Sequence, residues 1–367
     1  MRVAGRRAGG YEPIWPMHAH DFLLPRWLRN AHLQTLGAAA PLFCPPPSHA
    51  ALAAEDLRIP LPTGDHRLHA KVWWVHDESG ATIARRPMVV IVHGIGGSSE
   101  SKYVVRAAVA VHRAGYHVAR LDLRGAGASI PDAPSLYHAG LSSDLGVVVS
   151  HLAGGEHAAH LDGVVLLGFS GGGSMALKLA GELGERTPSA LRAIVSVSAP
   201  LDYTRVGRWM DTVARLPYRF HVLRGLSNGA REFARQHPSR AHYLPIDVKR
   251  MSTFRHYDGS VIVPMHGFSD VDEYYAAASP GPWLGKIHVP TLVLHADDDP
   301  MVPGDTVRPW LKDASSAVSA ALTPHGGHLG WVAGFDEASW ITSWSTRRAL
   351  AFLGERAPIE PSETLSR

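Results

Sequence analysis

The sequence predicts an α/β fold with a mostly parallel central sheet, helices on both faces of the sheet and an inserted lid. Three observations lead to this prediction. Short apolar runs alternate along the chain with segments of helical periodicity. The runs are apolar at consecutive positions, which is typical of parallel strands buried on both faces. The alternation breaks once, between residues 201 and 286, and then resumes.

The expected elements follow in chain order. Thr63-Gly64-Asp65 separates two β-rich runs and indicates a hairpin. Later runs end at turn residues, and Gly115 ends the first helical segment. Strands are expected at 56–60, 67–75, 88–92, 117–121, 164–169, 192–197, 291–295 and 317–322. Helices are expected at 101–114, at 141–152, from the glycines after residue 170 to residue 183, and at 336–352.

The same pattern divides the chain into three parts. Residues 1–50 are expected to form an irregular N-terminal arm, because prolines at 41, 45, 46 and 47 interrupt regular elements. The core is expected to comprise residues 51–200 and 287–367. Residues 201–286 contain no strong strand and are expected to form the lid. Its aromatic residues are expected mainly to pack its interior, with some lining an apolar site: Trp209, Tyr218, Phe220, Tyr243, Phe254, Tyr257, Phe268, Tyr274 and Tyr275.

The composition excludes several classes of protein. The chain has 367 residues, of which 45% are hydrophobic and 19% charged, which excludes wholesale disorder. Cys44 is the only cysteine, so an internal disulfide and a multi-cysteine metal site are impossible. The net charge of +3 comes from dispersed basic residues, so no nucleic-acid partner is expected. No apolar run approaches 18 residues, so no membrane-spanning helix is expected.

The N-terminal region shows neither a targeting sequence nor a convincing metal-binding motif. No apolar stretch follows its first arginines, so no signal peptide is expected and a cytoplasmic location is predicted. Among 23 histidines, His18-Ala19-His20-Asp21 is the best local metal candidate. It lies in a proline-bounded stretch without a helix or strand pattern, and we expect no metal there. The sequence leaves the oligomeric state open.

The strongest chemical signal is Gly168-Phe169-Ser170-Gly171-Gly172. It fits G-x-S-x-G, and an apolar strand precedes it while a helix follows, as this motif requires. Glycines on both sides of Ser170 permit a tight strand-to-helix turn without collisions of Cβ atoms. The hydroxyl would then project at the carboxyl edge of the sheet, near a helix N-terminus. Ser170 is therefore predicted to be a nucleophile.

A serine hydroxyl becomes a good nucleophile only when a base accepts its proton. The segment Thr-Pro-His-Gly-Gly-His follows the last expected strand and contains two candidates, His325 and His328. His328 is the preferred base, because it follows paired glycines and precedes the last helix, as expected for the chain order Ser, Asp, His. His325 remains the alternative.

The acid that orients the histidine should follow the strand before that segment. Asp297, Asp298 and Asp299 all stand at the carboxyl end of that strand. Three adjacent carboxylates cannot all point inward, and Asp299, next to Pro300, is the preferred triad acid. Asp298 remains the alternative. The role of this acid is to fix the imidazole tautomer and to stabilise the imidazolium.

An oxyanion hole needs two backbone amides. The first expected donor is Gly171, directly after the nucleophile. The second should come from the loop His-Gly-Ile-Gly-Gly after an early strand, where Ile95 is preferred and Gly96 is the close alternative. This loop lacks both G-x-x-x-x-G-K-[ST] and G-x-G-x-x-G, so it does not indicate a phosphate site.

These segments resemble the α/β-hydrolase fold and, more narrowly, the YheT-like group with its ABHD-type relatives. The resemblance spans roughly residues 25 to 355 and is carried by the segments at 30–35, 93–98, 124–125, 168–172, 267–268, 274–275, 298–300 and 326–328. The segment His32-Leu33-Gln34-Thr35 is the most specific of them. The resemblance implies Ser170, Asp299 and His328 as a triad. It also implies a carboxylesterase, lipase or phospholipase activity, with acyl transfer to an alcohol in some relatives.

The sequence departs from the family pattern at two positions. The family's leucine after the nucleophile is replaced by Gly171, which we expect to widen the acyl pocket. The proline before His32 is replaced by Ala31, which we expect to weaken the local turn. His32 itself is expected to be a buried residue that anchors the N-terminal arm, rather than a group at the catalytic mouth. Cys44 is expected to be inert.

Together these observations predict a serine hydrolase that cleaves carboxylic esters through an acyl-enzyme, without a cofactor. The expected substrate is a small-molecule ester with an apolar acyl chain. Two alternatives stay open. The same residues could pass the acyl group to an alcohol, or the chain could be a binding protein on a hydrolase scaffold.

Overall fold

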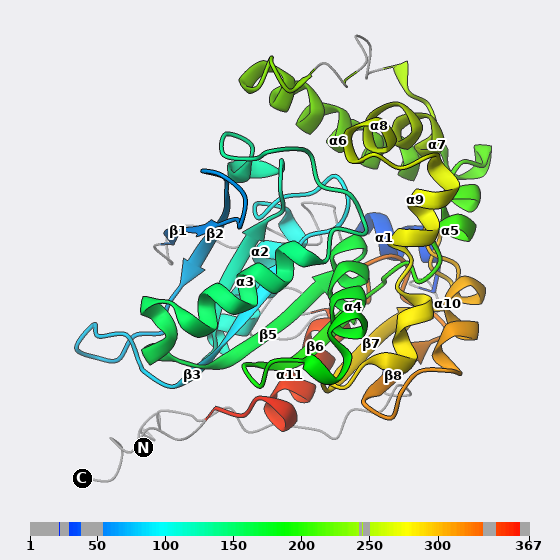
Figure 1. Cartoon of the computed structure of the whole chain (residues 1–367). Helices are drawn as coiled ribbons and strands as arrows, with labels where there is room; N and C mark the ends of the chain where they lie inside the picture. The colour runs from blue at the N-terminus through cyan, green and yellow to red at the C-terminus, as the bar shows by residue number, and fades with distance from the viewer. Residues whose placement is uncertain are drawn as a thin grey trace, which may run out of the picture.

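The strands of the protein form one mixed, mostly parallel sheet (Figure 1). The computed structural model describes residues 22, 29–37, 54–241, 244, 250–332 and 343–359. Within these residues the sheet has eight strands in the order β1-β2-β4-β3-β5-β6-β7-β8. The strands are β1 (Glu55–Pro60), β2 (Arg67–Trp73), β3 (Arg86–Val92), β4 (His117–Asp122), β5 (Leu161–Phe169), β6 (Leu191–Val197), β7 (Thr291–Ala296) and β8 (Val318–Thr323). The predicted fold class is confirmed.

The sheet begins with the expected hairpin. β1 pairs antiparallel with β2, and β2 pairs antiparallel with β4. From β4 to β8 all neighbouring strands are parallel. The carboxyl ends of the parallel strands therefore meet at one edge of the sheet, which is where ligands bind in open α/β folds.

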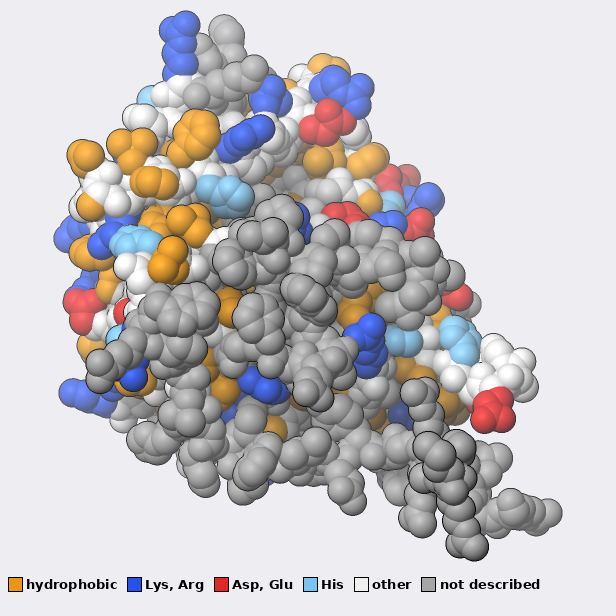
Figure 2. Space-filling model, turned by 180° about the vertical axis from the view of Figure 1, so that it is seen from behind, with side chains coloured by type: hydrophobic (Ala, Val, Ile, Leu, Met, Phe, Trp, Pro, Cys, Tyr) orange, Lys and Arg blue, Asp and Glu red, His pale blue; other side chains and the backbone are white. Residues whose placement is uncertain are grey.

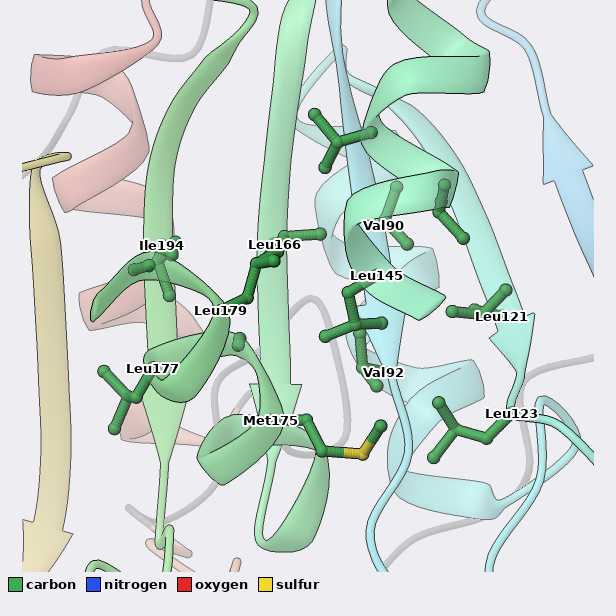
Figure 3. Packing of buried hydrophobic residues seen from close by; sticks show 14 of the residues in the cluster. Val90, Val92, Leu121, Leu123, Leu145, Leu166, Met175, Leu177, Leu179 and Ile194 are labelled. Carbon is green, nitrogen blue, oxygen red and sulfur yellow. The ribbon is translucent and has the colours of Figure 1, made fainter. Parts of the chain in front are cut away.

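The apolar runs are explained by burial on both faces. Side chains of a strand alternate between faces, so Val90 and Val92 enter one hydrophobic cluster while Val89 and Ile91 enter the other. The first cluster packs against α3 and α4, and the second contains residues of α2 and α11. Figure 3 shows part of the first cluster, with Val90, Val92, Leu121, Leu123, Leu145, Leu166, Met175, Leu177, Leu179 and Ile194 labelled.

The described residues form more helices than the sequence predicts. They are α1 (Ala31–Gly37), α2 (Lys102–Arg113), α3 (Ser143–Gly154), α4 (Gly171–Leu183), α5 (Tyr203–Met210), α6 (Leu216–Gln236), α7 (Phe254–Tyr257), α8 (Val263–His266), α9 (Val271–Ala278), α10 (Gly304–Leu311) and α11 (Trp344–Arg356). The prediction that residues 1–50 hold no regular element is wrong at α1. The first part of the helix predicted at 336–352 lies outside the described residues. None of the described helices is both long and apolar enough to cross a bilayer.

Among the described residues, the segment between β6 and β7 contains helices α5 to α9, which gather at one end of the molecule in Figure 1. A third hydrophobic cluster joins these helices to the loop after β4, through residues such as Leu136 and Ala139. Tyr257, Tyr274 and Tyr275 are buried in it, as expected for packing residues, whereas Phe220 is exposed. Tyr243 lies outside the described residues.

Candidate active site

Ser170 stands on the turn between β5 and α4 in a backbone conformation that few side chains adopt. Its φ is +50° and its ψ is −122°, a strained region for a residue with a Cβ. The flanking glycines make the turn possible. A Cβ on Gly168 would lie 2.5 Å from the backbone of Gly172 and Gly173, and a Cβ on Gly172 would lie 2.5 Å from the carbonyl oxygens of Val92 and His93.

The structure brings Ser170, His328 and Asp299 together in one hydrogen-bonded chain. The Ser170 Oγ lies 3.1 Å from His328 Nε2, and His328 Nδ1 lies 2.8 Å from Asp299 Oδ2. His328 is 6% exposed and Asp299 is 3% exposed. With the Nδ1 proton donated to Asp299, Nε2 can accept the hydroxyl proton of Ser170. This is the geometry that nucleophilic catalysis by serine requires.

The Asp299 carboxylate is held in its ionised form. Burial favours the neutral acid, but the electrostatic interaction and hydrogen bond with His328, with contributions from His295 and the Val302 amide, outweigh it and lower the pKa of Asp299. Its Oδ1 accepts from the amides of Met301 and Val302 at 2.8 and 2.9 Å. A carboxylate fixed by several donors can hold the imidazole in one orientation.

The two neighbouring aspartates have other partners. Asp297 forms a two-pronged ion pair with Arg308. Asp298 accepts from His325 Nδ1 at 3.1 Å and from the Gly327 amide at 2.9 Å. The alternatives kept open by the sequence, Asp298 and His325, are therefore paired with each other beside the Ser170–His328 pair.

The two preferred amide donors lie next to each other. A Cβ built on Gly171 would be 3.4 Å from the backbone nitrogen of Ile95. The amide of the alternative donor, Gly96, is donated to the Tyr137 hydroxyl at 2.7 Å. Gly94 likewise donates to the hydroxyl of Tyr103 at 2.8 Å. The loop that carries Ile95 is thus held by the hydroxyl groups of two tyrosines.

The expected widening of the pocket at Gly171 is wrong. A Cβ at this position would lie 2.6 Å from Cγ1 and 2.8 Å from Cδ1 of Ile95. The side chain of Ile95 therefore fills the volume that a leucine at position 171 would begin to occupy. The exchange of leucine for glycine is compensated from the neighbouring loop.

Helix α6 lies directly on the same loop. A Cβ on Gly225 would lie 2.3 Å from the carbonyl oxygen of Gly96, and a Cβ on Gly96, whose φ is +76°, would lie 2.8 Å from the carbonyl oxygen of Val222. Backbone meets backbone here, because both positions are glycine. The inserted segment is therefore in contact with the loop of the candidate oxyanion hole.

Helix α1 adds residues that the sequence analysis missed. Thr35 Oγ1 accepts the amide proton of His328 at 2.9 Å, and the fully buried Gln34 accepts the amide proton of Val332 at 2.8 Å. The sequence analysis singles out the segment that contains both residues, but the sequence does not show what they contact. Only the three-dimensional arrangement shows that it touches the histidine loop.

The expectation for His32 is wrong. His32 is exposed, and its Nδ1 lies 2.5 Å from the hydroxyl of Tyr218 in α6. Its ring stacks on Tyr218 with the centroids 5.7 Å apart. The buried anchor of this segment is Gln34 instead. Ala31 does not abolish the turn, since it starts α1, which Asn30 caps by accepting from the amides of His32 and Leu33.

Within the described part of the chain, no group of three or more His, Cys, Asp and Glu side chains could hold a metal ion. The candidate at His18 and His20 lies outside the described residues, as does Cys44.

The comparison with known proteins agrees with the fold. A family model for the alpha/beta hydrolase fold matches residues 87–332, and the chain belongs to this family. Within the family it is a YheT-like, ABHD-type hydrolase. It is 28% identical over 315 residues to "Putative esterase YheT" of Escherichia coli, and the match covers 86% of this chain and 88% of YheT.

More distant relatives are named for lipid esters. The chain is 28% identical over 254 residues to the monoacylglycerol lipase of Saccharomyces cerevisiae, with 67% of this chain and 55% of the lipase covered. It is 24% identical over 276 residues to human phospholipase ABHD3, with 71% and 63% covered. Among solved structures, the Pyrococcus furiosus esterase Pf2001 superposes with a TM-score of 0.53 at 18% identity, covering 85% of this chain and 96% of the esterase. This likeness concerns the fold alone.

Proposed function

We propose that this protein hydrolyses carboxylic esters through an acyl-enzyme on Ser170. The hydrogen-bonded chain from Ser170 through His328 to Asp299 carries the proposal. In the first step His328 Nε2 takes the hydroxyl proton while Ser170 Oγ forms a bond to the acyl carbon. The carbonyl oxygen becomes an oxyanion, which the amides of Gly171 and Ile95 stabilise.

The tetrahedral intermediate then collapses. The ester C–O bond breaks, and the alcohol leaves with the proton that His328 Nε2 carries. In the second half, a water molecule gives a proton to His328 and attacks the acyl carbon. The acid is released and Ser170 recovers its proton. Asp299 stays ionised throughout and stabilises the imidazolium.

We infer that the substrate carries an apolar acyl chain. Of the described residues, the large hydrophobic side chains that are clearly exposed lie in α1, just before α6 or in the first turns of α6: Leu33, Leu36, Val213, Leu216 and Phe220. The contact between His32 and Tyr218 joins these two elements. Figure 2 shows the molecule from the side opposite to Figure 1, and hydrophobic side chains gather on one part of the face seen there. Relatives named as a monoacylglycerol lipase and a phospholipase support the same substrate class.

We also propose that residues 201–286 form a lid on a core of residues 51–200 and 287–367, with residues 1–50 as an arm. The contact of α6 with the loop at Gly96 supports this division. The indole of Trp209 supports it as well, because it donates to the carbonyl oxygen of Pro300, next to Asp299.

The test is a series of p-nitrophenyl esters from acetyl upward, measured with the wild type, Ser170→Ala and His328→Ala. We expect the highest kcat/KM at a medium chain length, and a loss of about 10⁴-fold or more in either variant. A fluorophosphonate should label the wild type but not Ser170→Ala. Absence of both labelling and turnover would show a binding protein instead. Ester products formed with a short alcohol present would show acyl transfer.

A matched pair of variants tests the triad acid. Asp299→Asn should lower kcat by about 10⁴-fold, because the amide no longer fixes the required imidazole tautomer. Asp298→Asn should lower kcat by about tenfold at most, since Asp298 contacts His325 and the Gly327 amide rather than His328. Steady-state kinetics on one ester measures both. A larger loss in Asp298→Asn than in Asp299→Asn would contradict the assignment.

A further inference from the structure

We propose that helix α1 positions the catalytic histidine, with Thr35 as the positioning residue that acts through the backbone of His328. The inference rests on the proposed function, because it concerns the same imidazole. It assigns a task to the segment His32-Leu33-Gln34-Thr35, which lies far from Ser170 in the sequence.

The loop that carries His328 has an unusual backbone. Gly326, Gly327, Leu329 and Trp331 all have positive φ, at 151°, 60°, 59° and 43°. Two of these residues have side chains, and such conformations persist only where the surroundings hold them. The position of the His328 imidazole therefore depends on contacts that the loop makes with other parts of the chain.

Amides along this loop are bound from several directions. Gly327 donates to Asp298, His328 to Thr35, and Val332 to Gln34. Two of these three acceptors belong to α1. The amide of Leu329 reaches the hydroxyl of Ser198 after β6 at the longer distance of 3.4 Å.

The fit between α1 and the loop is close enough to require glycine. A Cβ on Gly327 would lie 2.5 Å from the carbonyl oxygen of Ala31 and 2.6 Å from Thr35 Oγ1, and a Cβ on Gly330 would lie 2.7 Å from the carbonyl oxygen of Gln34. The helix backbone thus forms one wall against which the loop rests. Neither residue can be larger without moving α1 or the loop.

Thr35 is oriented for this role. Its hydroxyl proton is donated to the carbonyl oxygen of Ala31 at 2.8 Å, which leaves a lone pair of Oγ1 for the amide of His328. Valine has nearly the same shape but cannot accept, so it would leave that amide without its partner. The loop would then shift, and a displacement of about 1 Å at the imidazole can cost up to about 10²-fold in rate.

The experiment compares Thr35→Val with Thr35→Ser and with Thr187→Val. Thr187 is the matched control. It is also half-buried, and its hydroxyl donates to the carbonyl oxygen of Gly184, three residues earlier. It lies after the C-terminal end of α4, whereas Ser170 precedes the N-terminal end. We expect Thr35→Val to lower kcat by about tenfold or more with KM within about twofold. The kcat of Thr35→Ser should stay within about threefold of the wild-type value, and the kcat of Thr187→Val should equal the wild-type value.

A second readout does not depend on turnover. The proton between His328 Nδ1 and Asp299 should give a low-field ¹H NMR resonance in the wild type, which Thr35→Val should shift or broaden and Thr35→Ser should retain. An unchanged kcat and resonance in Thr35→Val, with only a lower melting temperature, would overturn the proposal. A wild type without turnover or labelling would instead overturn the proposed function, while the resonance would still report on the positioning.

Discussion

At the scale of single residues, Gly171 and Ile95 act as a pair. The glycine leaves a space that the isoleucine side chain fills, with 2.6 Å between a Cβ at position 171 and Ile95 Cγ1. The same two residues supply the proposed oxyanion donors through their amides. A change in the size of one side chain is therefore transmitted to the backbone of the other.

A double-mutant cycle tests this pairing. Gly171→Ala alone should lower kcat by about tenfold, because the new methyl group pushes Ile95 and its amide away. Adding Ile95→Ala keeps the amide and removes the obstructing atoms, so the double variant should recover most of the loss. Measured kcat values that simply multiply across the cycle would show that the residues are independent.

The sequence was sufficient for residues whose roles follow local rules. The position of Ser170 between a strand and a helix could be predicted because that context is contiguous in the chain. Thr35 could not, since its partner His328 is 293 positions away and no periodicity records such a contact. The burial predicted for His32 is wrong for the same reason: no local pattern shows that Gln34, two residues further along α1, is the side chain that turns inward.

At the scale of elements, α6 and the loop that carries Ile95 and Gly96 approach closely because both have glycine at the contact. Gly225 meets the Gly96 carbonyl, while Gly229, one turn further along the helix, has its nearest neighbour at 3.9 Å. The two glycines of one helix thus differ in what an added methyl group would meet.

Gly225→Ala should therefore lower kcat/KM by about tenfold or more, because α6 must move off the loop. Gly229→Ala should leave activity unchanged and stabilise the protein by about 0.5–1 kcal/mol, as expected for glycine to alanine inside a helix. Ester kinetics and chemical unfolding of both variants provide the measurement. Equal activity of the two variants would refute a close coupling of α6 to the loop.

The elements of the sheet were predictable because apolar runs and glycine turns are local. Helices α1 and α10 were not predicted. In α1 the nearby prolines dominated the interpretation, although Asn30 caps the helix. In α10 an internal proline, Pro309, masks the helical pattern. Both helices are short, and their stability comes from packing rather than from propensity.

At the scale of the whole molecule, buried histidines link stability to pH. Burial lowers the pKa of His117 to about 4, of His138 to about 3 and of His266 to about 4. An unfolded chain would bind these protons near pH 6.5. The contribution of these neutral histidines to the free energy of unfolding is thus fully present above about pH 6.5 and is lost as the pH falls toward 4. Asp258 opposes this trend, since burial raises its pKa to about 7.

His117 offers a test of this linkage. Its Nδ1 accepts from the Val75 amide and its Nε2 donates to the Ile83 carbonyl, so protonation would break the first bond. His117→Gln can keep both bonds without titrating. Between pH 7 and pH 4.5 the free energy of unfolding should fall in both proteins. The fall should be smaller in His117→Gln than in the wild type, by up to about 3 kcal/mol. The exposed His221→Gln is the control, and a pH dependence of His117→Gln equal to that of the wild type would exclude this origin.

The contact between Thr35 and His328 has a consequence for assembly. The turn that carries Ser170 forms from neighbouring residues, but the loop of His328, the proposed general base, is in place only when the early and late parts of the chain have met. Contacts of such long sequence separation are costly to form and tend to slow folding. During refolding, the proposed esterase activity should therefore reappear after the spectroscopic signal of the sheet, and a chain that ends before residue 328 would contain Ser170 without its proposed base.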